Sequence, residues 1–366
     1  MKRLTLGDVC KKESSNIAQK NLQDKKGAYP IYGASGLIKQ VDFYQQDKEY
    51  IAVVKDGAGI GRTMLLPAYS SVIGTMQYLL PKEDIPIDIK YLFYAVEHMN
   101  LAKYFSGATI PHIYFRDYQK EPINIPDIET QRKISQIFGK IDALITSRKE
   151  QRTKLDQIVK SRFIELFGDP EINPYGWEQV TVEDVCTSIV RGPFGSALKK
   201  EFFVEPDQTT YKVYEQKHAI QKSAVIGTYY VSAEKYNELR RFECHPGDIL
   251  MSCSGTMGEL YQLPPDSEKG IINQALCKFT LNSRMLPIAF LAYMKETIGN
   301  LETKGSGIQN IAAVSYVKAM PINLPPMTVQ NQFAAFVEQT DKSKYRQEKC
   351  IRFFQCLEKN IRQEWL

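Results

Sequence analysis

Residue types that could carry out catalysis occur in this sequence, but their spacing does not favour a catalytic site. The stretch DGAGIGRT at 56–63 follows an apolar run, which is where phosphate-binding loops occur. Its glycines are spaced G-x-G-x-G rather than G-x-G-x-x-G, and the β-prone segment LLPAYSSVIG follows it instead of a helix. A tight hairpin is therefore favoured over a nucleotide site.

The remaining chemical groups lead to the same expectation. NPYG at 173–176 lacks the second proline of the N-P-P-Y loop of amino-methyltransferases, and its proline and glycine are typical of a helix end. The four histidines have no paired spacing for a metal ion, and no serine or cysteine stands in a nucleophile-elbow context. Seven cysteines without a C-x-x-C pair predict reduced, mostly buried thiols. We expect the chain itself to be non-catalytic and to bind no metal ion or cofactor.

Segments suited to DNA binding are more frequent. Five segments combine glycines, which let the backbone approach a ligand closely, with polar and basic side chains that can hydrogen-bond to bases and phosphates. Any one of these residues could equally belong to an ordinary turn or helix cap, so the prediction depends on the set. The segments are 29–40, 106–116, 191–200, 253–262 and 305–311. The candidate DNA-binding residues lie in or beside these segments or the glycine-rich stretch at 56–63, and they are Tyr32, Ser35, Lys39, Lys55, Arg62, Thr109, His112, Arg191, Ser196, Lys199, Lys200, Ser254, Thr256, Lys304, Ser306, Gln309 and Asn310.

These segments are distributed over the two halves of an internal repeat. EPINIPDIETQ at 121–131 matches MPINLPPMTVQ at 320–330 at an offset of 199 residues. LTLGDVC at 4–10 matches VTVEDVC at 180–186 at an offset of 176 residues. The chain is therefore interpreted as a tandem duplication whose second half carries about 23 extra residues between these points.

Each half is predicted to be an α+β domain. Short β-prone runs such as EYIAVV and GDILMSC alternate with turns rich in Gly, Pro and Asp, and one helix follows, near 89–104 in the first half and near 287–301 in the second. The predicted order along the chain is a first domain at 1–126, a central long helix at 127–168, a second domain at 169–325 and a C-terminal long helix at 326–366.

The two long helices each have one stripe of residues at 3-4 spacing, apolar at its ends and polar in the middle. A small domain cannot cover a stripe on the order of 55 Å long, so the helices are expected to pair. Antiparallel pairing lets the second domain enter and leave at one end, which predicts a coiled-coil rod with a domain at each end and a two-fold pseudo-axis. The alternative is two unrelated surface helices. The predicted contact positions are Ile134, Ile137, Ile141, Leu144, Leu155, Ile158, Phe333, Phe336, Phe354, Leu357 and Ile361.

Length and charge limit the classes of function. A chain of 366 residues is long for one core and fits two domains. Its net charge of +5 lies in the two helical stretches, and the rest is balanced. A protein that held DNA mainly by its phosphates would be more basic, so base contacts, DNA shape or a partner must contribute. The apolar runs are too short to span a bilayer and no signal peptide is present, which predicts a cytoplasmic protein without membrane contact.

The order of these features closely resembles the specificity subunits of bacterial type I restriction–modification systems. The resemblance covers the whole chain and includes two copies of the exit, PINIPDIETQRKI at 122–134 and PINLPPMTVQNQF at 321–333, each leading into a long helix. LFGDPEINPYGWE at 166–178 separates the first helix from the second domain. YPIYGASG and GAGIGRT are also similar to stretches common in the family's recognition domains.

This resemblance implies two target recognition domains, each reading one half of a bipartite asymmetric sequence in double-stranded DNA. It further implies a non-catalytic subunit that binds two adenine methyltransferase (M) subunits and, for restriction, ATP-driven motor-nuclease (R) subunits. S-adenosylmethionine, ATP and Mg are expected on those partners. The alternatives are a stand-alone dimeric DNA-binding regulatory or structural protein and a DNA adenine methyltransferase, for which the two halves leave no room for a cofactor domain.

Overall fold

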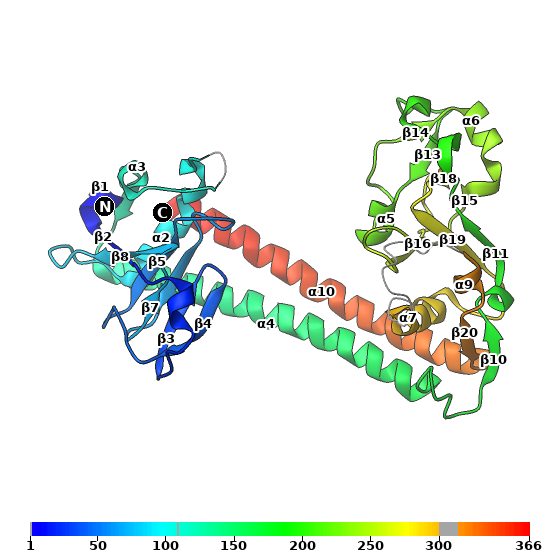
Figure 1. Ribbon diagram of the computed structural model, residues 1–366, viewed down its shortest axis with the longest axis horizontal. Coiled ribbons are helices and arrows are strands. Elements are labelled where there is room, and N and C mark those ends of the chain that lie inside the picture. Colours follow the sequence, from blue (N-terminus) through cyan, green and yellow to red (C-terminus); the bar gives the residue numbers. More distant parts are fainter. Residues whose placement is uncertain (1, 108–109, 300–313) are drawn as a thin grey trace. The chain divides into compact units, whose positions relative to one another are not determined.

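The computed structural model of the chain describes residues 2–107, 110–299 and 314–366. These form two compact units, Met1–Gln151 with Arg346–Leu366, and Arg152–Tyr345 (Figure 1). Both units combine sheets and helices, and the predicted α+β class is confirmed. In the described part of the chain, no helix has both the length and the apolar character needed to cross a membrane.

The first unit is built on a four-stranded antiparallel sheet, in the order β2-β8-β5-β6. A three-stranded sheet, β4-β3-β7, and the antiparallel pair β1-β9 accompany it. Helix α2 packs its apolar side against the strands of the four-stranded sheet, and this contact forms the largest core of the unit. The elements are β1 (Lys2–Thr5), α1 (Leu6–Val9), β2 (Cys10–Ser14), β3 (Tyr29–Gly33), β4 (Gly36–Val41), β5 (Tyr50–Val54), β6 (Thr63–Leu66), β7 (Ser71–Val72), β8 (Met76–Pro81), α2 (Ile89–His98), α3 (Phe115–Tyr118) and β9 (Pro122–Ile125).

The second unit repeats this plan. Its four-stranded antiparallel sheet, β11-β19-β16-β17, has the same chain order as the first, and β10-β20 corresponds to β1-β9. Helix α7 takes the place of α2 in the core. The elements are β10 (Glu178–Thr181), β11 (Cys186–Arg191), β12 (Phe203–Val204), β13 (Tyr211–Tyr214), α5 (Gln216–Ile220), β14 (Tyr230–Val231), α6 (Ala233–Glu238), β15 (Glu243–Cys244), β16 (Ile249–Ser252), β17 (Leu260–Gln262), β18 (Gly270–Ile272), β19 (Leu276–Leu281), α7 (Pro287–Thr297), α9 (Val314–Lys318) and β20 (Pro321–Leu324).

The extra residues of the second half enlarge the sheet that corresponds to β4-β3-β7 of the first unit. In the first unit β3 pairs antiparallel with β4 and parallel with β7. In the second, β13 pairs antiparallel with β14 and parallel with β18, and β12 and β15 are added at the two edges. The repeat and its insertion are therefore visible in the strand pairing, and the four-stranded sheet is unchanged.

The predicted helix at 89–104 is too long. Asp88 begins α2 by accepting a hydrogen bond from the Tyr91 N–H at 2.9 Å. The helix ends at His98, because Asn100 adopts the left-handed conformation with φ +48°, and residues 101–104 form a separate 3₁₀ turn. The prediction at 287–301 ends at Thr297 in the structure, and its last two residues lie outside the described ones.

A buried glutamine explains why the same exit sequence occurs twice. In the first unit the Gln131 Oε1 accepts from the Asp88 N–H at 2.8 Å, and its Nε2 donates to the carbonyls of Pro126 at 2.9 Å and Pro86 at 3.2 Å. The side chain thereby joins the start of α2, the proline turn and the start of the long helix. Gln131 is fully buried, so each of these polar groups depends on it for a partner.

Gln330 makes the same contacts in the second unit. Its Oε1 accepts from the Leu286 N–H at 2.8 Å, and its Nε2 donates to the carbonyls of Arg284 at 2.9 Å and Pro325 at 3.0 Å. We call each set, centred on Gln131 or Gln330, the glutamine latch. The repeated P-x-N-[IL]-P…Q pattern thus encodes the junction between a sheet domain and a long helix.

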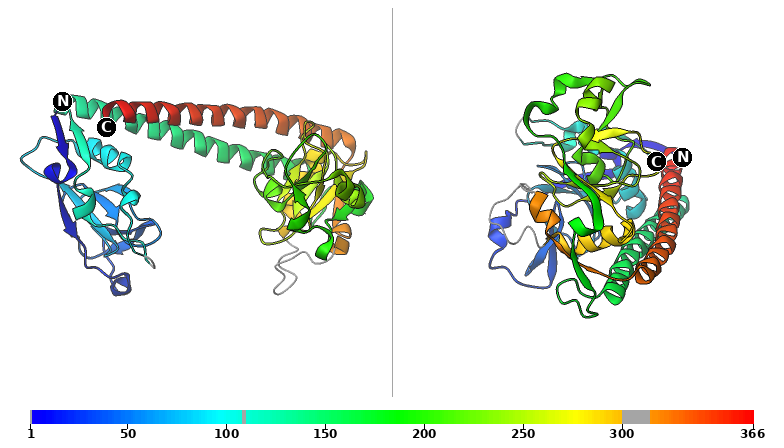
Figure 2. Two further views of the ribbon diagram at one scale, coloured as in Figure 1. Left: turned by 90° about the horizontal axis from the view of Figure 1, so that it is seen from above. Right: turned by 90° about the vertical axis from the view of Figure 1, so that its right-hand side faces the viewer.

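The long helices α4 (Ile128–Phe167) and α10 (Met327–Trp365) each contribute a segment to both units and lie side by side (Figure 2). In the first unit Ile141 and Ile145 pack with Ile351. The chain direction is antiparallel, because residues further along α4 meet residues earlier in α10, as in the 3.3 Å hydrogen bond from Arg148 to Gln347.

The same antiparallel packing occurs in the second unit. The rings of Phe163 and Phe333 lie 5.8 Å apart, and Asp156 and Lys344 form a 2.7 Å ion pair. The matched helices predicted from the sequence therefore contact each other within each unit.

The predicted contact stripe is wrong at four positions. Ile137, Leu144, Ile158 and Leu357 are exposed, with relative exposures between 37% and 48%. The buried stripe advances by four and then three residues, whereas the prediction advanced by three and then four. In the first unit it contains Ile134, Phe138, Ile141 and Ile145. Among the other predicted positions Phe333 is buried, and the half-buried ones are Leu155, Phe336, Phe354 and Ile361.

A contact with the sheet domain accounts for this difference. The ring of Phe138 lies 4.7 Å from that of Tyr94 on α2, and the Tyr94 hydroxyl donates to Asp142 at 2.7 Å. The helix must therefore turn Phe138 toward α2, which leaves Ile137 facing solvent.

Candidate nucleic-acid interface

Parts of two predicted binding segments, 29–40 and 106–116, meet the glycine-rich hairpin loop on the first unit. The hairpin loop 55–62 joins β5 to β6, and its Gly57 N–H donates to the Pro111 carbonyl at 2.9 Å. The Ile113 N–H donates to the Lys55 carbonyl at 3.0 Å. Arg62 reaches the β3–β4 turn, where its guanidinium donates to the Ala34 carbonyl at 2.8 Å. Lys55, Arg62, His112 and the exposed Ser35 are thereby brought into one surface.

Gly61 allows this loop to pack closely. Its φ is +78°, and a Cβ atom at this position would lie 2.4 Å from the Ala102 nitrogen. A larger residue would therefore push the loop away from the 3₁₀ turn. The glycine spacing that first suggests a phosphate cradle serves a hairpin that is held against its own domain.

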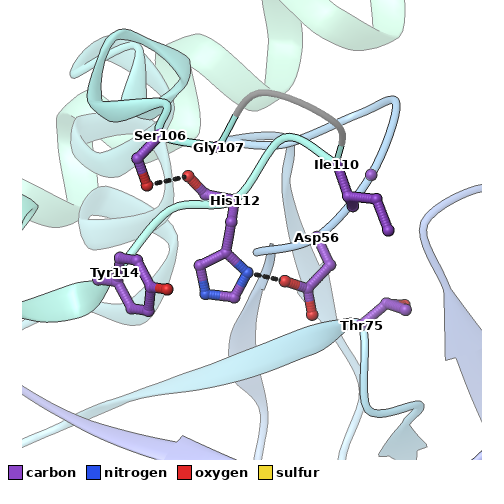
Figure 3. A pocket seen from close by; sticks show the side chains of 8 residues that line it. Asp56, Thr75, Ser106, Gly107, Ile110, His112 and Tyr114 are labelled. Atoms are coloured by element: carbon purple, nitrogen blue, oxygen red, sulfur yellow. Dashed lines mark hydrogen bonds and ion pairs between the residues drawn. The ribbon is translucent and has the colours of Figure 1, made fainter.

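An open hollow of about 640 Å³ lies between this loop and residues 106–107 and 110–114 (Figure 3). Asp56 is at its centre. One oxygen of Asp56 contacts Nδ1 of His112, and the other forms a 3.0 Å ion pair with Lys55. The His112 and Tyr114 rings lie 4.1 Å apart, and Thr75 lines the opposite side. The hollow therefore combines a carboxylate, an imidazole, hydroxyls and an aromatic face.

Lys39 and Tyr32 have structural contacts that the sequence did not indicate. The Lys39 ammonium donates to the carbonyls of Leu22 at 2.7 Å and Gln23 at 3.2 Å, so it fastens the turn before β3. Tyr32 is half-buried against the core around Tyr50. Their roles in DNA binding stay predictions.

In the second unit, Arg191 lies at the end of β11. Its Nε donates to the Gln274 carbonyl at 3.1 Å, and its guanidinium lies over the exposed Phe194 ring at 5.3 Å. Gly192 permits the close approach, because a Cβ there would lie 1.9 Å from the Asn273 oxygen. Of the other candidates in this segment, the exposed ones are Ser196, Lys199 and Lys200.

Ser254 and Thr256 lie on the hairpin loop between β16 and β17. Ser254 is half-buried and Thr256 is exposed. The Gln216 amide donates to the Thr256 carbonyl at 3.5 Å, which connects this loop to α5. Each of the two hairpin loops therefore contacts a neighbouring segment of its own unit.

Five of the predicted binding residues are not part of the described structure. They are Thr109, Lys304, Ser306, Gln309 and Asn310.

Several residues in these surfaces were missed by the sequence analysis. Asp56, Thr75 and Tyr114 line the hollow, and Gln216 and Gln274 border the second loop. Asp56 directly precedes the glycine-rich stretch, but its negative charge does not neutralise phosphates, so it was not among the predicted binding residues. Thr75 carries no local signal, because it comes from a separate turn that β8 positions.

Burial makes two of the cysteine thiols poor nucleophiles. Burial raises the pKa of Cys10 to about 12 and that of Cys186 to about 12, so both remain protonated near neutral pH. Among the described residues, no group of three or more His, Cys, Asp or Glu side chains could hold a metal ion.

Comparison with known proteins matches both halves. The family model "Type I restriction modification DNA specificity domain" covers residues 1–157 and again 174–351. A Haemophilus influenzae protein, named as a candidate type I restriction enzyme specificity subunit, is 20% identical over 330 residues, which are 85% of this chain and 80% of that protein.

Two solved structures share the fold. The S subunit of the type I restriction–modification system from M. genitalium aligns with a TM-score of 0.62 at 13% identity, over 100% of this chain and 96% of its own. A chain from a study of complex assembly and conformational transition of the type I R-M system aligns with a TM-score of 0.61 at 14% identity, over 99% and 96%. The similarity extends through both units.

Proposed function

This chain belongs to the type I restriction modification DNA specificity domain family, and from that premise we propose that each of its units reads one half of a bipartite, asymmetric DNA target. The observation that carries the proposal is the repeated recognition surface. Each unit presents a rigid hairpin loop, 55–62 or 253–259, at the same edge of the same four-stranded sheet. The two loops differ in sequence, so the two half-sites differ.

The chemistry of these surfaces supports base reading in duplex DNA. Lys55, Arg62 and Arg191 supply positive charge, and hydroxyl, amide and carboxylate groups lie beside them. Hydrogen-bonding side chains on rigid loops are suited to distinguishing base edges in the major groove. The net charge of the chain is only +5, so a partner is expected to close around the DNA and supply further phosphate contacts.

The partners that we propose are two adenine methyltransferase subunits and, for restriction, motor-nuclease subunits. The chain then acts as a non-catalytic recognition subunit. S-adenosylmethionine would be held by the methyltransferase subunits, and ATP and Mg by the motor-nuclease subunits. The paired helices α4 and α10 are the proposed spacer, because each is a continuous helix that leaves one unit's glutamine latch.

Methylation assays test this function. The purified chain is incubated with S-adenosylmethionine and genomic DNA, with and without its methyltransferase subunits, and modified adenines are mapped by sequencing. We expect no methyl transfer by the chain alone and, with the subunits, methylation at a target with two unequal halves around an unread spacer. Methyl transfer by the chain alone, or sequence-independent methylation by the complex, would refute the proposal.

A further inference from the structure

Asp56 is an unexpected group on a surface that is proposed to bind DNA. Lys55 and Arg62 lie on the same loop, and the Arg116 guanidinium is 4.7 Å from the Tyr114 ring at the edge of the hollow. Phosphates attract these cations and repel a carboxylate. A carboxylate is favourable at a DNA surface where it accepts a hydrogen bond from a base amino group.

The carboxylate is held in place but still has acceptor capacity. Lys55 pairs with Oδ2 of Asp56, and His112 contacts Oδ1. An ionised carboxylate has about four acceptor positions, so these two partners leave about two unused. The side chain of Asp56 is 24% exposed and that of His112 is 26% exposed, both toward the hollow (Figure 3).

The contact with Asp56 also defines the hydrogen-bonding role of His112. Because the carboxylate accepts, Nδ1 of His112 donates, and this contact orients the imidazole ring beside Asp56. The unused acceptor positions of Asp56 remain available to the hollow. In a base pair, one hydrogen of an exocyclic amino group points into the major groove and can be donated to this carboxylate, whereas a carbonyl oxygen is repelled.

We propose that Asp56 is a specificity-determining residue that accepts a hydrogen bond from an exocyclic amino group in the major groove, N6 of adenine or N4 of cytosine. Guanine and thymine present O6 and O4 acceptors at this point and are rejected. The inference rests on the proposed DNA-reading function and deepens it, because it assigns one base class to one residue of the first unit.

The second unit carries a different group at the equivalent position. In the first loop the Val54 N–H donates to the Arg62 carbonyl and the Gly61 N–H to the Val54 carbonyl, at 2.9 and 2.8 Å. In the second loop Ser252 makes the same two bonds, with the Glu259 carbonyl and the Gly258 N–H, both at 2.9 Å.

Asp56 lies two residues after Val54, and Ser254 lies two residues after Ser252, so Asp56 and Ser254 occupy equivalent positions. Each precedes a glycine with positive φ, Gly57 at +88° and Gly255 at +62°. A hydroxyl can both donate and accept, so Ser254 does not impose an amino group on its base.

A reciprocal exchange in the full chain tests the inference. Asp56→Ser and Ser254→Asp variants are each assembled with the methyltransferase subunits, and methylated sites are sequenced. Asp56→Ser should lower the discrimination against guanine and thymine at one position of the first half-site about tenfold. The second half-site should be unchanged. Ser254→Asp should impose adenine or cytosine at one position of the second half-site and leave the first intact.

The second half-site serves as the internal control for folding. If the Asp56→Ser complex methylates no DNA, the isosteric Asp56→Asn variant decides, because it also removes the charge that rejects guanine and thymine. Unchanged discrimination at every position of the first half-site in an active variant would overturn the inference. That result leaves the proposed function standing, whereas a wild-type complex without a bipartite target refutes the function itself.

Discussion

Replacing Gln131 by alanine tests the glutamine latch. The substitution removes the 2.8 Å bond from the Asp88 N–H and the bonds to the Pro126 and Pro86 carbonyls at 2.9 and 3.2 Å. Gln131 is fully buried, so water does not readily replace these partners. At roughly 1 kcal/mol for each lost bond, the free energy of unfolding should fall by about 3 kcal/mol. The midpoint of thermal unfolding of this unit should fall by roughly 6 to 12 °C.

The two tryptophans allow the affected unit to be identified. Trp365 packs in the core of the first unit and Trp177 lies in the second. In a Trp177→Phe background, the fluorescence of Trp365 therefore follows the first unit during urea unfolding. Gln136 is exposed on the same helix, and Gln136→Ala is the matched control, with an expected change within about 0.5 kcal/mol.

The reasoning fails if Gln131→Ala and Gln136→Ala have the same unfolding midpoint. A loss of stability in the second unit without a change in the unfolding that Trp365 fluorescence follows would also contradict a latch that acts locally. Gln330→Ala should give a loss of similar size in the second unit, because its three bonds have nearly the same lengths.

Three further predictions concern the helices and a buried histidine. Ile141→Ala should lower the free energy of unfolding by about 2 to 4 kcal/mol, because the Ile141 side chain is 4% exposed. Ile137→Ala should change it by no more than about 0.5 kcal/mol, because Ile137 is 44% exposed. Equal losses in urea unfolding would mean that Ile137 belongs to the helix contact, as the sequence predicted. Burial lowers the pKa of His218 below its usual 6.5, so the unfolded chain binds the proton more readily than the folded one. The contribution of His218 to the stability of the second unit should be fully present above pH 6.5 and should decline as the pH falls below it. A His218→Gln variant should show a flatter pH dependence of its unfolding midpoint, and an unchanged slope would exclude His218 as the cause. Inserting one seven-residue repeat into both α4 and α10 at matched positions adds about 10 Å to each helix, so the unread spacer should lengthen by roughly three base pairs while both half-sites persist; a changed half-site with an unchanged spacer would exclude the helices as the ruler.

The repeat and the positions of the junctions could be predicted from the sequence. Pro122 and Gln131 recur as Pro321 and Gln330, because a turn and a buried hydrogen-bonding side chain need particular residue types. Hydrogen bonds of this kind can be predicted because they depend on residues within a short motif. The strand order of the sheets was not predicted, because it depends on pairings between residues far apart in the sequence.

The phase of the helix stripe could not be settled by periodicity alone. Both Ile137 and Phe138 are apolar, and either fits a heptad that begins at Ile134. The choice is made by Tyr94, a residue of another element whose ring packs on Phe138. Long-range contacts of this kind select between two local patterns of equal quality.

The candidate binding surface was predicted in part, for a similar reason. Glycine-rich loops mark the segments, and the structure brings Lys55, Arg62 and His112 together. Asp56 was not predicted because a carboxylate is repelled by DNA phosphates, and the sequence does not show which groups surround it. Its proposed function depends on Lys55 and His112, which only the folded loop places around it.

The glutamine latches make the two halves of the chain separable as coding units. Every partner of Gln131 belongs to the first unit, and every partner of Gln330 belongs to the second. A gene segment that ends at one exit sequence can therefore be exchanged for another with the same exit, because the incoming piece brings the atoms that form its own glutamine latch. New combinations of half-sites would then arise from recombination within the gene where the incoming domain keeps the contacts that Tyr94 makes with Phe138 and Asp142 of α4.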